Sequence, residues 1–136
     1  MSIDCDEFVN NVQLFFSFLK DEYGMIVIDK ISRKNIFHSV RYENDHFLIS
    51  ISYECIENYF NVQLIRIING KLSSYDDVVN SYSLDRLYAL ITPYVDNKKL
   101  YENTKLFDFH INNEIQKKIL KSAKKLRICL QYIDML

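Results

Sequence analysis

The sequence predicts an α+β fold, in which an antiparallel β-meander of three to four strands packs against an N-terminal helix and C-terminal helices. Three observations support this class: an aromatic stripe at helical spacing near the N-terminus, two alternating apolar and polar stretches joined at Asn44-Asp45, and helical periodicity in the second half. The 136 residues suit a single domain over 1–136, which is long enough to bury a substantial core.

The first helix is expected to begin at a cap on Asp4 or Asp6 and to run to about Tyr23, where Gly24 supplies the stop. Its apolar residues recur every three or four positions and so share one face. They are Phe8, Val12, Phe15, Phe16, Leu19 and Tyr23. A strand rich in β-branched residues follows over 25–32.

The stretch VRYENDHFLISISYE (residues 40–54) predicts a β-hairpin. A two-residue turn at Asn44-Asp45 would place Val40 opposite Ile49 and leave one face buried and the other wetter. The buried face carries His38, Val40, Tyr42, Phe47, Ile49, Ile51 and Tyr53. The wetter face carries Ser39, Arg41, Glu43, Leu48, Ser50 and Ser52. A further strand over 59–68 continues the buried face and ends at the turn signal Asn69-Gly70.

The second half is predicted to be helical. Polar residues 73–77 indicate a loop that opens a short helix, and Ser83 caps a helix that ends near Pro93. Residues 96–110 are expected to form a loop, after which Asn112 or Asn113 caps the last helix. The core stripe of this helix is Ile115, Ile119, Ala123, Leu126, Leu130 and Ile133.

Motifs for catalysis or cofactor binding are missing from the sequence. Two glycines exclude phosphate-binding loops and dinucleotide fingerprints, and three cysteines and three histidines lack metal-ligand spacing. We therefore expect no metal, no cofactor and no enzymatic activity. An odd number of widely spaced cysteines fits a reducing cytosol, and neither a targeting segment nor a membrane span is recognisable. These features predict a cytoplasmic protein.

Nucleic-acid binding is the less favoured interpretation of the basic residues on the last helix. The formal net charge is −1, so the whole chain has no strong attraction for phosphate. A solvated helix face explains the basic residues, with a phosphate-tracking patch as the alternative. They are Lys117, Lys118, Lys121, Lys124, Lys125 and Arg127.

The order of elements in the first half carries a family resemblance. A helix with an aromatic stripe ends at DEYGM and is followed by a strand, the alternating hairpin and another apolar strand. The positions concerned are Val40, Tyr42, Asn44, Ile49, Ile51, Tyr53, Glu54, Val62 and Leu64. This pattern resembles small bacterial immunity proteins of polymorphic toxins, including contact-dependent growth inhibition systems. The resemblance implies a protein that binds and neutralises a cognate toxin domain by occlusion.

An occluding protein needs exposed aromatic and charged anchors. Ordinary loop residues are the alternative interpretation of the candidates. These are Glu54, Glu57, Tyr59, Tyr75, Asp76, Asp77, Tyr82 and Asp85. Two other functions remain open: a structural or adaptor subunit that acts through oligomerisation, and a small enzyme with an unrecognised site.

The last helix has more apolar surface than its core stripe requires. Ile128, Tyr132 and Met135 are spaced i, i+4 and i+7 and fall beside the lysines. Packing within the chain, for example against residues 96–110, explains this strip. Contact with a second copy of the chain or with the partner is the alternative.

Overall fold

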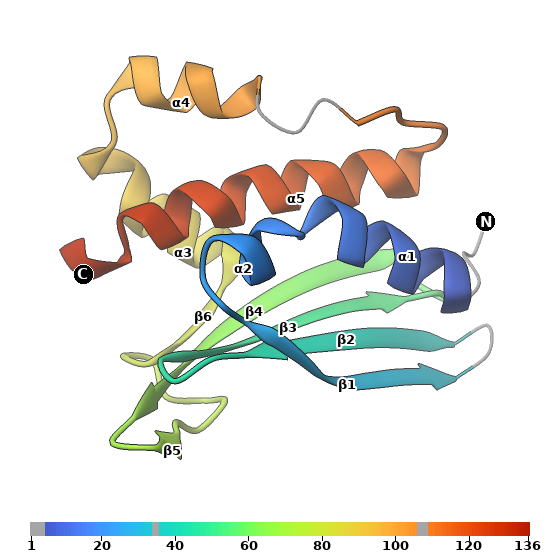
Figure 1. The fold of residues 1–136 in the computed structure, drawn as a ribbon, viewed down its shortest axis with the longest axis horizontal. Coiled ribbons are helices and arrows are strands. Elements are labelled where there is room, and N and C mark those ends of the chain that lie inside the picture. The colour runs from blue at the N-terminus through green and yellow to red at the C-terminus, as the bar shows by residue number, and fades with distance from the viewer. Residues whose placement is uncertain (1–4, 34–35, 106–108) are drawn as a thin grey trace.

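A curved antiparallel sheet, covered on one face by helices, organises the chain (Figure 1). The computed structural model describes residues 5–33, 36–105 and 109–136. Over these residues a meander of long strands is extended by two short strands that both pair with β4. The strands are β1 (Ile26–Arg33), β2 (Phe37–Glu43), β3 (Phe47–Glu54), β4 (Tyr59–Ile68), β5 (Lys71–Leu72) and β6 (Ser81–Ser83). The predicted α+β class and antiparallel meander are confirmed.

The helices form two layers above the sheet (Figure 1). Contacts to the sheet come from α1, α3 and α5, whereas α4 packs on α5. The helices are α1 (Cys5–Phe15), α2 (Phe18–Asp21), α3 (Leu84–Ile91), α4 (Asn97–Thr104) and α5 (Glu114–Gln131), with short 3₁₀ helices η1 (Thr92–Tyr94) and η2 (Ile133–Met135).

The single N-terminal helix that the sequence predicted is divided into α1 and α2. A continuous helix would point Phe16 and Phe18 in nearly opposite directions, because residues two apart do not share a face. The break at Phe16-Ser17 lets both rings enter the core, where their centroids lie 6.0 Å apart. Of the two predicted caps, Asp4 lies outside the described residues and Asp6 lies within α1.

Gly24 ends the N-terminal helical segment as predicted. Its φ of 62° lies in the left-handed region, which favours glycine. The amide of Gly24 donates to the carbonyl of Lys20, and the amide of Met25 donates to the carbonyl of Leu19. These bonds satisfy carbonyl groups at the helix end and direct the chain into β1.

The predicted register of the β2–β3 hairpin is wrong by two residues. Ile49 lies opposite Tyr42, and Ile51 lies opposite Val40. The turn lies one residue further along the chain than predicted: the amide of Asn44 donates to the carbonyl of Phe47, and the side-chain oxygen of Asn44 accepts hydrogen bonds from the amides of His46 and Phe47, at 2.8 and 2.9 Å. A shift of two residues keeps every side chain on its face, so the predicted faces survive the error.

The face of the meander toward the helices is the core, as predicted, except that Phe47 is only half-buried. His38 is a buried core histidine whose ring stacks on Phe8 and whose Nδ1 lies 2.8 Å from the Ser32 hydroxyl. The opposite face of the sheet is less exposed to solvent than predicted. Ser39 and Leu48 on this face are buried.

Two helix caps in the second half are the residues that the sequence predicted, whereas two predictions about loops are wrong. Ser83 caps α3 and Asn113 caps α5. Residues 96–110 contain α4, whose N-cap Asp96 accepts a hydrogen bond from the amide of Lys99 at 2.8 Å. Residues 73–77 open no helix, and the chain continues through turns into β6.

The structure contradicts the alternative that Ile128 forms an intermolecular contact. Ile128 is 1% exposed and Tyr132 packs against the core, whereas Met135 is 54% exposed. The reason is that α5 contacts α1, α3, α4 and β4, so it is enclosed on several sides. One of these neighbours is α4, which lies within the segment over 96–110. The side chain of Asn103 on α4 donates a hydrogen bond to the carbonyl of Lys124 on α5.

Replacing Ile49 by Ala is expected to lower the free energy of unfolding by about 2–5 kcal/mol, because it removes buried methylenes and leaves a cavity. Ser50→Ala on the opposite face of β3 is the control and should change this free energy by less than about 0.5 kcal/mol. Urea unfolding measures both. Equal effects of the two variants would contradict the assigned faces.

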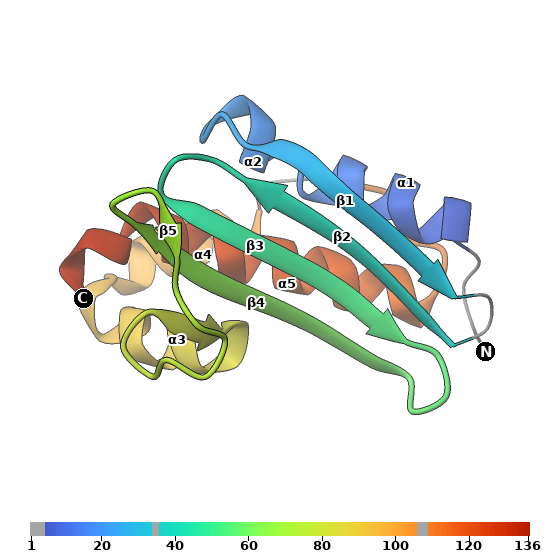
Figure 2. The same ribbon diagram turned by 90° about the horizontal axis from the view of Figure 1, so that it is seen from below.

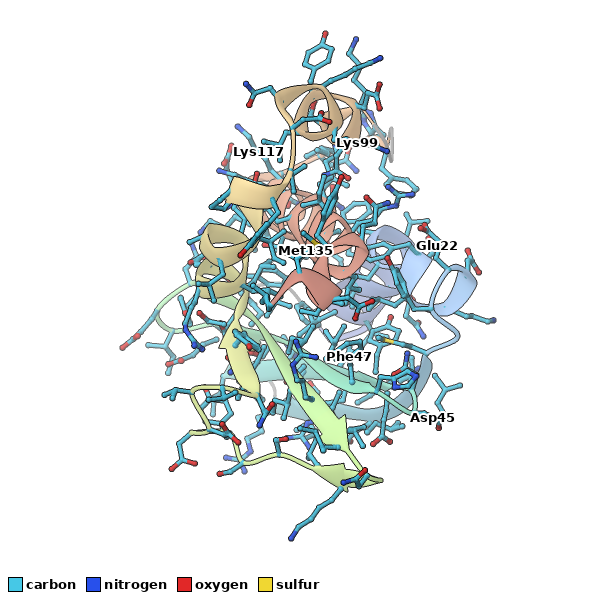
Figure 3. All side chains as sticks on the ribbon, turned by 90° about the vertical axis from the view of Figure 1, so that its left-hand side faces the viewer. Glu22, Asp45, Phe47, Lys99, Lys117 and Met135 are labelled. Atoms are coloured by element: carbon cyan, nitrogen blue, oxygen red, sulfur yellow. The ribbon has the colours of Figure 1, made fainter. Side chains whose placement is uncertain are left out.

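Ile128→Ser should lower the free energy of unfolding by more than about 2 kcal/mol, because it removes apolar volume and buries a hydroxyl. Met135, which lies on the end of the molecule shown in Figure 3, provides the matched control. Met135→Ser should leave thermal unfolding nearly unchanged. A stable Ile128→Ser monomer would show that this side chain is not core.

Candidate functional site

The loop over residues 73–80 connects β5 to β6 and is held by hydrogen bonds on several sides. The amide of Ser73 donates to the carbonyl of Arg66, and the carbonyl of Asn80 accepts from the amide of Arg66 at 2.8 Å. Both ends of the 73–80 loop are therefore attached to β4. Because its ends are fixed, little conformational entropy remains to be lost when the loop binds a partner.

Asp77 organises the interior of this loop. Its carboxylate accepts hydrogen bonds from the amides of Val79 and Asn80, at 2.9 and 3.2 Å, and from the side-chain amide of Asn80 at 3.0 Å. The Asn80 side chain, followed by these backbone amides, holds the pKa of the Asp77 carboxyl below its usual value of 3.8. Asp77 is thus a structural residue of the 73–80 loop.

Arg86, on the first turn of α3, clamps the loop from outside. Its guanidinium donates to the carbonyls of Val78 and Ser81 and lies over the ring of Tyr82, 4.7 Å from the centroid. The Tyr82 hydroxyl donates to the carbonyl of Val79. One planar cation therefore fixes one carbonyl of the loop, one carbonyl of β6 and one buried ring.

The fixed loop presents large apolar side chains to solvent. Val78 is 71% exposed, Tyr75 is 69% exposed and Val79 is 66% exposed. Asp76, beside them, is also exposed. Apolar residues gathered in one short segment at a polar surface are typical of a binding site for another macromolecule.

The structure separates the predicted partner-binding residues into two groups at opposite ends of β4 (Figure 2). Glu54, Glu57 and Tyr59 lie at the β3–β4 turn, where Glu57 and Tyr59 are exposed and Glu54 is half-buried. The second group surrounds the 73–80 loop. It comprises Tyr75, Asp76, Asp77, Tyr82 and Asp85.

Members of the second group have different environments. Tyr75, Asp76 and Asp85 are exposed, as an anchor must be. Tyr82 is 6% exposed, so the prediction that it is a surface anchor is wrong: its ring is covered because β6 places it on the core face opposite Leu64. The sequence interpretation missed Val78, Val79 and Arg86. Two adjacent valines in a polar stretch were the available signal.

The basic residues of α5 are divided between internal and exposed roles. Lys124 donates to the carbonyl of Thr104, Lys125 lies over the ring of Tyr88, and Arg127 pairs with Glu22 at 3.1 Å. The exposed remainder is Lys117, Lys118 and Lys121. Because the partly buried cations already contact the protein, a continuous phosphate-tracking face is less well supported than a solvated helix face.

One shallow pocket of about 220 Å³ joins α5 to the β3–β4 turn. It is lined by Lys118, Lys121 and Lys125 together with Tyr59 and Ser122, among others. The sequence did not indicate this neighbourhood, because Tyr59 and the lysines are about sixty residues apart. Tyr59 is therefore an aromatic side chain beside basic residues.

Elsewhere, burial raises the pKa values of Cys129 and Tyr42. Burial raises the pKa of the Cys129 thiol to about 12, so its thiolate is not populated at neutral pH. Burial likewise raises the pKa of Tyr42 to about 12. Tyr42 contributes to a groove of about 470 Å³ that is also lined by Phe16 and Met25.

Metal-ligating side chains do not gather in the described part of the chain: no group of three or more His, Cys, Asp or Glu residues there is arranged to hold an ion. Within the same residues, no helix has the length and apolar character needed to cross a membrane.

Comparisons with known proteins gave no match to a protein-family model, a curated protein or a solved structure. The resemblance of the first half to immunity proteins therefore stays a prediction.

Asp77→Ala should loosen the 73–80 loop without unfolding the core, because it removes the acceptor of the Val79 and Asn80 amides. Hydrogen exchange should accelerate at these amides and stay unchanged at Ile49. Asp76→Ala is the control, since the Asp76 carboxylate bonds the Ser74 hydroxyl instead. Similar exchange in both variants would contradict the role of Asp77.

The order of this loop should also depend on pH. A carboxyl whose pKa is lowered on folding stabilises the folded loop fully above its unfolded value of 3.8, and this stabilisation is lost as the pH falls through the lower folded pKa. Exchange-sensitive NMR signals of Val79 should report this loss on acidification in the wild type and be insensitive in Asp77→Ala.

Proposed function

We propose that this chain is a cytoplasmic immunity protein that binds a cognate secreted toxin domain and neutralises it by occlusion. The main support for this proposal is the 73–80 loop. Its backbone is held by hydrogen bonds, and the side chains of Tyr75, Val78 and Val79 are exposed to solvent. Exposed apolar side chains cost solubility, so their display on a fixed loop is best explained by burial against a partner.

Rigidity of the loop supports binding by preformed contacts. Association costs conformational entropy when loops and side chains become ordered, and a loop already held by Asp77 and Arg86 avoids much of this cost. Tyr75 adds a large ring with few rotatable bonds, which suits a central anchor.

The charges around the loop favour a basic partner surface. Asp76 and Asp85 are both exposed near the apolar side chains. Complementary charge accelerates encounter and fixes orientation, which matters for a protein that must capture a toxin soon after its arrival. The association rate should therefore fall as salt concentration rises.

A structural or adaptor subunit is the alternative function for the same loop. Both functions need a protein partner, but only an immunity protein protects a cell. Growth of cells that produce the toxin domain therefore distinguishes the two.

The proposal predicts that a large secreted protein is encoded next to this chain, and the test uses the C-terminal domain of that protein. Production of that domain alone should stop bacterial growth, and production of this chain with it should restore growth. A variant with Tyr75→Ala, Val78→Ser and Val79→Ser should lose protection and bind the domain at least ~30-fold more weakly, as expected for the loss of about 2 kcal/mol at an anchor.

Tyr101→Ala provides a matched control, because Tyr101 is an exposed tyrosine on α4, away from the loop. It should leave protection intact. Full protection by the triple variant, or a neighbouring domain that does not inhibit growth, would contradict the proposal.

A further inference from the structure

Strand β1 is a free edge of the sheet. It pairs with β2, and no other strand among the described residues lies along its outer side (Figure 2). The strand is eight residues long, and Ile26, Ile28 and Ile31 are exposed on it. An edge of this length and apolar character is a template for pairing with another strand.

Two backbone hydrogen bonds at the ends of β2 show which of its residues bond to β3 and which bond to β1. The amide of Asn44 donates to the carbonyl of Phe47, and the amide of Cys55 donates to the carbonyl of Ile36. Antiparallel pairs alternate between bonded and non-bonded types. Even-numbered residues of β2 therefore direct their backbone groups toward β3, and odd-numbered residues direct theirs toward β1.

This alternation determines which backbone groups of β1 point outward. Ile31 lies opposite the odd-numbered Ser39, so its backbone groups are directed toward β2. Lys30 and Ser32 then direct their N–H and C=O groups away from the sheet. The outer edge thus offers two donors and two acceptors at the spacing of a regular antiparallel ladder.

Side chains of this segment alternate between the two faces. Asp29, Ile31 and Arg33 lie on the face without helices, because their partners Arg41, Ser39 and Phe37 belong to that face. When two copies pair edge to edge around a two-fold axis, residues that lie opposite each other must point to the same face of the joined sheet. Because faces alternate along the strand, the numbers of two opposite residues differ by an even number. The two-fold axis therefore passes through one residue of β1 and not between two residues.

Charge complementarity favours Ile31 as this residue. An axis at Asp29 or at Lys30 would place like charges directly opposite each other. An axis at Ile31 places Ile31 against its own copy and, on each side, Asp29 against Arg33 of the second copy. Lys30 then lies opposite Ser32 of the second copy, and these two outward-pointing residues form the hydrogen-bonded pairs.

We infer that β1 pairs with β1 of a second copy of this chain, antiparallel and centred on Ile31, to form one continuous sheet across a homodimer. Its central contact is a non-hydrogen-bonded pair of Ile31 side chains, in which side chains approach most closely. On each side, Asp29 lies between Arg41 of its own chain and Arg33 of the second copy.

The features that protect edge strands do not block this register. The β-bulge of β1 lies between Val27 and Asp29, so the pairing from Asp29 to Arg33 is regular. Lys30 lies on an exposed edge, as protective lysines do, but in this register it faces Ser32 and no other lysine.

The dimer would be a second interaction surface, independent of the partner surface. β1 is at one edge of the sheet, whereas the 73–80 loop is attached to β4 near the other (Figure 2). A short strand pair buries less area than a stable complex requires, so a weak dimer is expected. The wild-type chain should be a monomer at ~1 µM and a dimer at ~1 mM.

Charge reversal tests the register. Asp29→Arg places two arginine side chains opposite each other, one from each copy, and Arg33→Asp places two aspartates opposite each other. Each variant alone should weaken the dimer at least ~10-fold in sedimentation equilibrium. An equimolar mixture of the two variants should recover dimer formation, because every opposed pair in the mixed dimer is then oppositely charged.

Recovery on mixing cannot result from a folding defect. Asp29→Arg also faces Arg41 within the chain, so circular dichroism should confirm that it folds. Lys30→Pro is an independent variant, because it removes an outward N–H that β2 does not use. It should abolish the dimer and keep the monomer folded. Lys98→Glu on α4 is the control and should leave the dimer unchanged.

Three results would overturn the inference: a wild-type chain that stays monomeric at ~1 mM, a dimer that tolerates Lys30→Pro, or charge variants that do not recover on mixing. Loss of the dimer in these variants would leave growth protection intact, so this inference and the proposed function fail separately.

Discussion

The burial of one face of the meander against α1 and α5 is the constraint on which the rest of the structure depends. Rings from both layers meet there: Phe8 of α1 stacks on His38 of β2 and on Tyr53 of β3. These side chains are almost fully buried, and a large part of the hydrophobic free energy comes from such contacts. Because helices occupy this face, the open face of the sheet, its two edges and the loops beside β4 are left for contacts with other molecules (Figure 1).

The same constraint explains why the sequence predicted faces better than it predicted turns. A period of two assigns each residue of β2 and β3 to a face, whatever the register, so the core residues Val40, Ile49 and Ile51 were identified correctly. Register depends on the turn, where the side chain of Asn44 accepts two amide hydrogen bonds and the closing pair is Asn44 with Phe47. A side-chain hydrogen bond of this kind competes with a turn centred on Asn44-Asp45, and the dipeptide Asn-Asp is compatible with both positions of the turn.

The candidate site was harder to predict because exposure is a tertiary property. Tyr75 and Tyr82 look equivalent in the sequence, yet pairing of β6 with β4 buries Tyr82 and leaves Tyr75 in solvent. Ile128 looked surplus to the core stripe because helical periodicity describes one docking face, whereas α5 is enclosed by several neighbours. Arg86 joins residues on two elements, and no local pattern indicates such a clamp.

The division of the surface follows from the order of the strands. β1 is regular beyond its bulge, so its outer edge has the repeating backbone groups that another strand can extend. On the opposite side, β4 is paired with the short strands β5 and β6, and the loop between them is fixed through Asp77 and Arg86. An edge of repeated backbone groups suits a symmetric contact between identical chains, whereas a loop of distinct side chains suits recognition of one different partner. One sheet can therefore carry both contacts without competition between them.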